Sequence, residues 1–315
     1  MSDSNIYVDL KNLVALQFQA TGFSFLPRQP VHSVLSGRHG SRLRGRGLDF
    51  EELRHYRTGD DIRTMDWKVT NRTGKPHVRV FNEERERPVL LLIDQRTSMF
   101  FGSRVKMKSV VAAELAALAA WRVLDVGDRV GALIFNDTEI LEIKPRRSRK
   151  TVMQILHTLI QFNHALGADT PHSQNDSQLD VALKETERLC GHDYLIVIVS
   201  DMSGWSSQSA KRIKRLAWHN DIIASLVFDP LEKELPDKSK LVLSDGDMQI
   251  QVDSGKADLR DKFTGGFVSS VEQLQSELHK HSVPVIPIDT VEPVVNQVRQ
   301  TIGEHIKSRR STRYR

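Results

Sequence analysis

Two aspartates in this 315-residue chain follow apolar runs of the kind that form buried strands. Asp94 ends the run over residues 89–93, and Asp201 follows the run over residues 194–200. Runs without polar alternation indicate strands buried on both faces of a sheet. Because α/β sheets place ligand sites at the carboxyl ends of their strands, we expect both carboxylates at one functional edge. A guanidinium two residues after the first of them, on Arg96, can pair bidentately with either carboxylate.

The segments around these loops alternate between strand and helix patterns. Further strands are predicted at residues 128–135, 138–143, 222–228 and 283–288, with a hairpin at 241–252, and helices at 107–126, 151–162, 179–189, 207–219, 270–281 and 291–306. The short alternating segment 138–143 suits an antiparallel edge strand, and Pro284 and Pro287 restrict the last strand to an edge. The predicted fold is α/β, a doubly wound and mostly parallel sheet.

The first 87 residues are predicted to form an N-terminal extension packed on a sheet domain of residues 88–306. Within the extension we expect an amphipathic helix at 9–20, a glycine- and arginine-rich loop at 36–47, a helix at 61–72 and a strand at 76–81. The basic residues 307–315 are predicted to be a disordered tail.

The composition is that of a globular protein with a sizeable core. Hydrophobic residues make up 39% and charged residues 27%, and the net charge is +5. One cysteine, Cys190, excludes an internal disulfide framework, and its apolar helical surroundings predict a small buried side chain. No apolar run approaches the roughly 20 residues that span a bilayer, and the N-terminus lacks the pattern of a signal peptide. We therefore expect a cytoplasmic protein.

Three predicted loops carry a recognisable set of side chains. The first holds Asp94, Arg96 and Ser98, the second holds Ser177, and the third holds Asp201. Together they resemble the metal-ion-dependent adhesion site of von Willebrand factor type A domains, which has an Asp-x-Ser-x-Ser loop, a threonine and a second aspartate. The resemblance implies a protein-binding role in which Mg²⁺, held by hard oxygen ligands, receives a carboxylate from the partner.

Arg96 stands where that pattern has its first serine. A guanidinium has only donors and stays protonated, so it cannot ligate a metal. Our hypothesis is a metal-free, degenerate adhesion site in which Arg96 replaces the ion and can itself receive an acidic side chain of the partner. In the alternative, Arg96 faces solvent, and the site is inert or binds Mg²⁺ weakly through Asp94, Ser98 and Asp201.

A second resemblance lies upstream, over about residues 37–94, and extends loosely to residue 291. The motif residues resemble domain-of-unknown-function family 58; they are Gly47, Phe50, Arg54, Tyr56, Gly59, Asp60, Asp61, Arg63, Asp66 and Trp67. That family implies a chaperone-like adaptor that works with a MoxR-type AAA+ ATPase in maturing or remodelling other proteins. The acidic and basic residues of the motif could fasten this segment to the domain or present it to a partner.

The sequence carries no recognisable motif for catalysis. There is no Walker A loop, no dinucleotide fingerprint, no nucleophile elbow and no zinc spacing, so we expect a non-enzyme without a cofactor. The alternative function is binding of nucleic acid or an anionic surface through residues 38–46, 211–215 and 309–315. These basic stretches are scattered and contain few aromatic residues, which makes nucleic acid the less favoured partner.

Overall fold

The computed structural model describes residues 3–21, 48–83, 87–167, 177–236, 240–244, 249–255 and 257–301. The chain divides into two compact units, Leu26–Glu86 and the combination of Met1–Phe25 with Arg87–Arg315. One division therefore lies next to the predicted boundary at residue 87. The other differs from the prediction, because the first 25 residues group with the sheet and not with the rest of the extension.

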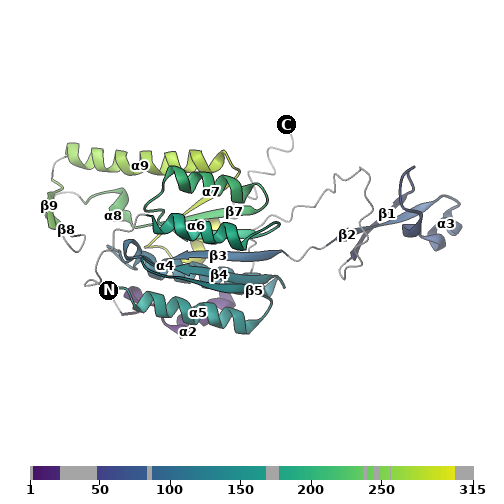
Figure 1. Ribbon diagram of the computed structural model, residues 1–315, viewed down its shortest axis with the longest axis horizontal. Helices are drawn as coiled ribbons and strands as arrows, with labels where there is room; N and C mark the ends of the chain where they lie inside the picture. Colours follow the sequence, from purple (N-terminus) through teal and green to yellow (C-terminus); the bar gives the residue numbers. More distant parts are fainter. Residues whose placement is uncertain are drawn as a thin grey trace. The chain divides into compact units, whose positions relative to one another are not determined.

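The large unit is built on a six-stranded sheet with the order β10-β7-β6-β3-β4-β5 (Figure 1). Its strands are β3 (Pro88–Asp94), β4 (Arg129–Phe135), β5 (Ile140–Arg146), β6 (Leu195–Ser200), β7 (Asp221–Phe228) and β10 (Val285–Asp289). All neighbours are parallel except β4 and β5. The predicted doubly wound, mostly parallel sheet is confirmed, with β5 and β10 at its edges.

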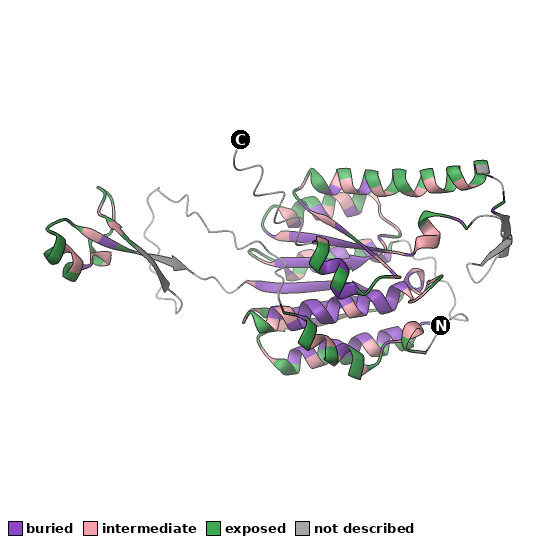
Figure 2. Ribbon diagram, turned by 180° about the vertical axis from the view of Figure 1, so that it is seen from behind, coloured by how far each residue is buried: buried purple, intermediate pink, exposed green. Residues whose placement is uncertain are grey.

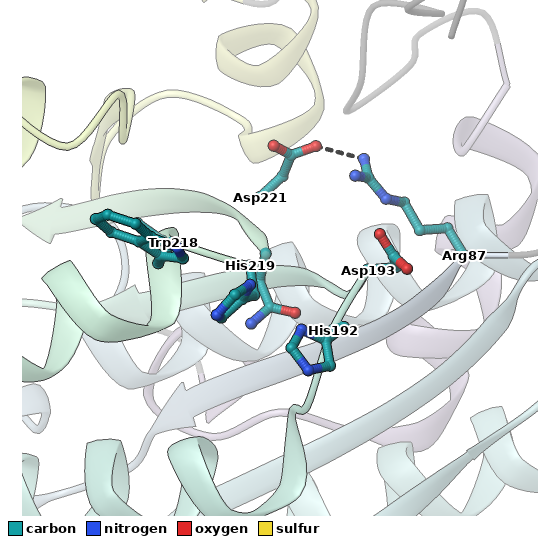
Figure 3. Close-up of a pocket in the computed structure, with 8 residues that line it drawn as sticks. Arg87, His192, Asp193, Trp218, His219 and Asp221 are labelled. Atoms are coloured by element: carbon teal, nitrogen blue, oxygen red, sulfur yellow. Dashed lines mark hydrogen bonds and ion pairs between the residues drawn. The ribbon is translucent and has the colours of Figure 1, made fainter. Parts of the chain in front are cut away.

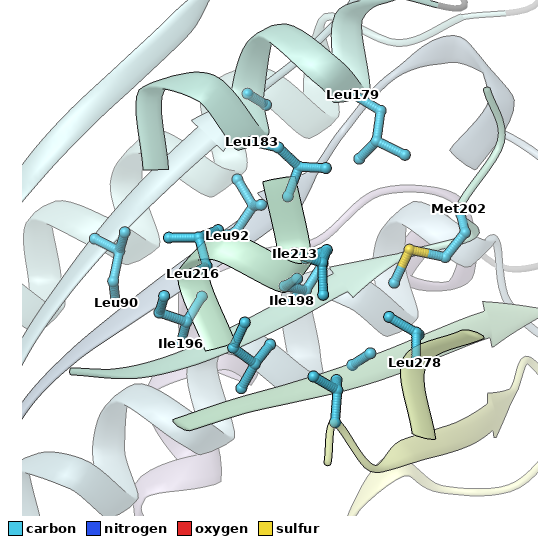
Figure 4. Packing of buried hydrophobic residues seen from close by; sticks show 14 of the residues in the cluster. Leu90, Leu92, Leu179, Leu183, Ile196, Ile198, Met202, Ile213, Leu216 and Leu278 are labelled. Atoms are coloured by element: carbon cyan, nitrogen blue, oxygen red, sulfur yellow. The ribbon is translucent and has the colours of Figure 1, made fainter. Parts of the chain in front are cut away.

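Helices cover both faces of this sheet (Figure 1). One face carries α4 (Lys108–Asp125) and α5 (Arg149–His164), and the other carries α6 (Gln178–Leu189), α7 (Ser207–Ala217) and α9 (Ala257–His279). Every residue of β3 is buried, as its unbroken apolar sequence predicts (Figure 2). On the second face, Leu92 and Ile198 of the central strands pack with Leu183 and Ile213 of the helices (Figure 4).

The segment before residue 25 packs against the first face of the sheet unit. It contains α1 (Asp3–Ile6), α2 (Leu10–Ala15) and the 3-10 turn η1 (Leu16–Gln19). Leu13 is fully buried, and its carbonyl accepts a hydrogen bond of 3.0 Å from the indole of Trp121 on α4. Tyr7 donates to the carbonyl of Leu166, after α5, at 3.1 Å. These contacts explain why this part of the extension belongs with the sheet.

The small unit contains a hairpin and one helix. Strands β1 (Leu48–His55) and β2 (His77–Glu83) pair antiparallel, and between them lie η2 (Ile62–Thr64) and α3 (Trp67–Thr73). The sequence pattern did not indicate β1, and the single helix expected at 61–72 is wrong. Asp66 interrupts it, because its backbone is extended and its carboxylate caps α3 by accepting from the amides of Lys68 and Val69.

The segment between β7 and β10 differs most from the prediction. A short helix, α8 (Pro230–Lys233), leads to the hairpin β8 (Lys240–Ser244) and β9 (Gln249–Asp253), and α9 then begins at Ala257 and not at residue 270. Gly265 and Gly266 made this part a poor helix by propensity, yet both lie inside α9. The last helix begins at residue 294, against a prediction of 291. Among the described residues, no helix is both long and apolar enough to cross a membrane.

Candidate functional site

The strand order identifies where a crevice forms at the carboxyl ends of the strands. Counted along the chain, the six strands lie in the order 3-2-1-4-5-6, so the winding direction reverses between β3 and β6. Loops that leave such a pair of strands diverge and open a crevice at the carboxyl ends. Asp94 is the last residue of β3, and Asp201 directly follows β6. Both predicted carboxylates therefore lie at the point where this fold accommodates ligands.

Asp94 is fully buried and is paired with Arg96. The Nε of Arg96 donates to the two carboxylate oxygens at 3.0 and 3.1 Å, and Nη2 donates to Oδ2 at 2.6 Å. The same Nη2 donates to the carbonyl of Ser203 at 3.0 Å and lies 3.7 Å from Oδ1 of Asp201. Only 4% of the Arg96 side chain is exposed. The guanidinium thus points inward, between the loops that follow β3 and β6.

A second cation, Lys108, lies beside Asp201. Its Nζ is 2.9 Å from Oδ2 of Asp201 and 2.6 Å from Oε1 of Glu232, which belongs to α8. The exposed fractions of the three side chains are 3% for Lys108, 5% for Asp201 and 30% for Glu232. The aromatic ring of Phe101 lies below the ammonium, with 5.9 Å between Nζ and the ring centroid.

These residues form a continuous series of alternating charges, Asp94, Arg96, Asp201, Lys108 and Glu232, which we call the ionic chain. Burial works to raise the pKa of Asp201, but the charges of Lys108 and Arg96 outweigh it and lower the pKa to about 2. Burial likewise works to lower the pKa of Lys108, yet its two carboxylate neighbours hold that pKa above its usual value. Burial raises the pKa of Asp94, and the guanidinium of Arg96 opposes this shift only in part.

A tight turn after β6 orients the second carboxylate. Ser200 donates from Oγ to Asp94 at 2.6 Å and accepts from the amide of Met202 at 2.9 Å. Met202 has a φ of 59°, in the left-handed region that side chains rarely adopt, and its side chain is buried in the core (Figure 4). Strained backbone of this kind is concentrated at functional sites. Here this backbone conformation lets the amide of Ser203 donate to Oδ1 of Asp201 at 2.9 Å.

The other residues proposed for this edge lie in different environments. Ser98 has its Oγ buried without a hydrogen-bond partner among the described residues. Ser177 is exposed at the N-cap position of α6, next to residues 168–176, which lie outside the described ranges. Thr97 anchors the first loop, because its amide and hydroxyl both donate to Asp137 after β4, at 2.8 and 2.6 Å. The structure thus brings together Asp94, Arg96 and Asp201.

The donor set does not fit a divalent cation. Mg²⁺ requires free oxygen ligands in near-octahedral geometry. Both oxygens of Asp94 accept from the guanidinium, and those of Asp201 accept from Lys108 and a backbone amide. The two buried carboxylates are already balanced by two positive charges, those of Arg96 and Lys108. This is the same charge of +2 that Mg²⁺ would contribute. Among the oxygens of Asp94, Ser98 and Asp201, only the buried hydroxyl of Ser98 has no hydrogen-bond partner in the described chain.

Sequence reasoning found Arg96 and missed Lys108 and Glu232. Lys108 is the first residue of α4, where a positive charge opposes the helix dipole. A lysine predicted at a helix start is thus a signal, although a weak one. Glu232 gave a different signal, since it completes a capping box with Asp229 at the start of α8. That pattern predicts a helix end and says nothing of a lysine 124 residues away.

The motif residues of the small unit form a local network of their own. Arg54 makes a bidentate pair with Asp60, both bonds at 2.8 Å, and Asp66 pairs with Arg79 at 2.7 Å. Gly59, directly before Asp60, has a φ of 109°, which only glycine adopts readily. These contacts join the two strands to the segment 56–76 that connects them.

The remaining motif residues have various positions. Tyr56 donates its amide to the carbonyl of Pro76, Asp61 caps η2 through the amide of Arg63, and Trp67 is 60% exposed. Phe50 lies in β1, with its side chain outside the described part, and Gly47 also lies outside it.

A shallow hollow of about 430 Å³ lies at the opposite edge of the sheet, where β6 and β7 begin (Figure 3). Arg87 and Asp221 form an ion pair on one side of it, and His192 and His219 lie edge to face with 4.4 Å between ring centroids. Trp218 is 76% exposed beside them. This hollow is separate from the ionic chain and provides positions for control substitutions.

Of the basic stretches, only residues 211–215 lie within the described ranges. Arg212 and Arg215 of α7 both pair with Glu187 of α6, at 2.7 and 3.2 Å. Part of the positive charge of α7 is therefore neutralised within the protein. Residues 38–46 and 309–315 lie outside the described ranges.

Comparison with known proteins identifies the family. The family model described as "Protein of unknown function DUF58" matches residues 52–272. The chain belongs to the DUF58 family. Uncharacterized proteins of Mycobacterium tuberculosis and Mycobacterium bovis are 32% identical to it over 227 residues, which is 71% of this chain and 68% of each relative. The predicted membership of domain-of-unknown-function family 58 is thereby confirmed.

Solved structures similar to this DUF58 protein have low sequence identity. The conserved hypothetical protein BatB of Bacteroides thetaiotaomicron is 13% identical with a TM-score of 0.44, and the alignment covers 70% of this chain and 99% of the solved chain. An aerotolerance-related membrane protein of Bacteroides fragilis is 12% identical with a TM-score of 0.39, and the alignment covers 69% of this chain and 99% of the solved chain.

Proposed function

We propose that this DUF58 protein is a non-enzymatic adaptor that binds another protein at the carboxyl edge of its sheet, in the manner of a von Willebrand factor type A domain. The observation that carries the proposal is the inward-facing Arg96, bonded to both oxygens of Asp94 at the switch point of the sheet. The ion of a metal-dependent adhesion site is replaced by Arg96 and Lys108. Binding of the partner then requires no divalent cation.

Charge balance supports this replacement. Two carboxylates buried together need compensating positive charge, since an unpaired buried charge costs several kcal/mol. Arg96 and Lys108 supply it from within the chain, at distances of 2.6 and 2.9 Å from the two carboxylates. Because Arg96 is almost fully buried, the partner meets the rim of the crevice first, where Ser203 and Glu232 reach solvent.

We assign the partner as a MoxR-type AAA+ ATPase, with the adaptor acting beside it in the cytoplasm in maturing or remodelling client proteins. This assignment rests on membership of the DUF58 family. The binding of nucleic acid is less favoured, because Arg212 and Arg215 of α7 both pair with Glu187, which offsets part of the positive charge of this helix.

A binding assay with the purified chain and the MoxR-type ATPase of the same organism tests the proposal. We expect capture that is equal in MgCl₂ and in EDTA (with the nucleotide state of the ATPase fixed beforehand), and that is lost in Arg96→Gln and Asp201→Asn. Trp218→Ala, at the opposite edge, is the matched control and should bind normally. Equal capture by all variants, with their folding verified by circular dichroism, would refute a role for this edge.

A further inference from the structure

The ionic chain has one end in the core and the other at the surface. Asp94 is fully buried, the side chains of Arg96, Asp201 and Lys108 are 3–5% exposed, and that of Glu232 is 30% exposed. The first four charges sum to zero, so Glu232 adds a negative charge that the core does not require. It is the member of the series that can leave without stranding a buried carboxylate.

The position of Lys108 is unfavourable for a positive charge unless anions lie beside it. It is the first residue of α4, so the positive end of the helix dipole adds to its own charge. Its ammonium has three donors. Asp201 and Glu232 each accept from one of them, and no further hydrogen bond of Nζ is found in the described chain. The ring centroid of Phe101 lies 5.9 Å from Nζ. Two carboxylates thus converge on one buried amine, one fixed in the core and one on a surface helix.

Glu232 itself lies on a short surface helix. It belongs to α8, which has four residues, and its second oxygen accepts from the amide of Asp229 at 2.8 Å. Asp229 has further partners that do not involve Glu232: the amides of Ser103 and Leu231 and the hydroxyl of Thr290 all donate to it. The end of β7 is therefore fixed without Glu232.

We infer that Lys108 is the position that receives an acidic side chain of the partner, and that Glu232 is a resident carboxylate which the incoming one displaces. This inference rests on the proposed function and names the chemistry that the partner must present. Exchange of one carboxylate for another keeps the charge around Lys108 constant. Glu232 then moves into solvent, so partner binding is linked to a new position of the Glu232 side chain.

The site favours a carboxylate over a phosphate group. Lys108 already lies 2.9 Å from Asp201, and the ionic chain with Glu232 carries a net charge of −1. A phosphate dianion in place of Glu232 would add a further negative charge beside a buried aspartate, at a cost that a single lysine does not offset. An aspartate or glutamate of the partner avoids this cost.

The accessibility of Lys108 to an amine-acylating reagent, read by mass spectrometry of the full chain, tests the inference without the natural partner. In the wild type, Glu232 protects Lys108. In Glu232→Gln and Glu232→Ala, acylation of Lys108 should rise about tenfold or more, the effect of losing one charge-assisted hydrogen bond. A hexaglutamate peptide should restore protection in both variants, whereas inorganic phosphate should not. Glu234→Gln, an exposed carboxylate in the same segment, is the matched control and should behave as the wild type.

Unchanged acylation in both Glu232 variants, or failure of hexaglutamate to protect Lys108, would overturn the inference. Protection by phosphate would overturn the preference for a carboxylate and show that Lys108 accepts anions in general. Melting curves show whether each variant is folded. The ATPase assay separates this inference from the proposed function. If Arg96→Gln abolishes capture while Glu232→Gln leaves it unchanged, the binding edge stands and the displacement of Glu232 is wrong.

Discussion

Arg96→Ser should turn a metal-independent protein into one that is stabilised by magnesium. The substitution restores the Asp-x-Ser-x-Ser spacing of a metal-dependent adhesion site in the loop after β3. It removes the guanidinium that donates to both oxygens of Asp94 and to the carbonyl of Ser203. Asp94 keeps the hydroxyl of Ser200 and the amide of residue 96 as donors but loses its counter-ion.

The expected cost follows from the burial of Asp94. Removing one partner of a fully buried ion pair typically destabilises a protein by about 3–5 kcal/mol. For a unit of this size that corresponds to a fall in melting temperature of roughly 6–20 °C. If the opened site then binds Mg²⁺, saturation at a hundred times the dissociation constant returns about 2.7 kcal/mol.

Thermal and urea unfolding in EDTA and in millimolar MgCl₂ measure both effects. We expect the wild type to unfold identically in the two buffers, and Arg96→Ser to be less stable in EDTA and to recover in part with magnesium. Adding Asp94→Asn to Arg96→Ser should abolish the recovery. A wild type that magnesium stabilises as much as the variant, or a variant without any loss of stability, would refute the role given to Arg96.

Three further predictions follow from the same contacts. The pKa of Asp201 is lowered from 3.8 to about 2, so its ionised form stabilises the fold above pH 4. This stabilisation, about 2 kcal/mol, should be lost as the pH falls from about 4 to 2. Asp201→Asn should flatten that part of an acid-unfolding curve. Gly102→Ala should destabilise the loop that leads to Lys108 by about 1–3 kcal/mol in urea unfolding, since a Cβ there would lie 2.2 Å from the carbonyl oxygen of Lys106, whereas Gly191→Ala, with open space, should not. Cys190 should resist a thiol reagent until the protein is unfolded, because burial raises its pKa to about 12; rapid reaction of the native protein would contradict this.

The sheet was predictable because its signals are local. The unbroken apolar runs of β3 and β6 indicate strands buried on both faces, and the alternation before Arg146 indicates the antiparallel edge strand β5. The long helix α9 was predicted only in part. The Gly265–Gly266 pair lowers helix propensity, and α9 nevertheless continues through both residues.

The candidate site was predictable only where its partners are near in sequence or belong to a known pattern. Arg96 lies two residues from Asp94, so their pairing follows from spacing. Lys108 and Glu232 meet across 124 residues, through a contact that only the packing of α8 beside the start of α4 creates. The sequence around Lys108 and the sequence around Glu232 each indicate the start of a helix, and both helices are present. Neither pattern indicates the ion pair between the two residues.

A crystal structure of the wild type grown in millimolar MgCl₂ tests the central claim most directly. The account predicts Arg96 bonded to both oxygens of Asp94, Lys108 between Asp201 and Glu232, and no cation among them. A magnesium ion held octahedrally by Asp94, Ser98 and Asp201, with Arg96 turned into solvent, would contradict it.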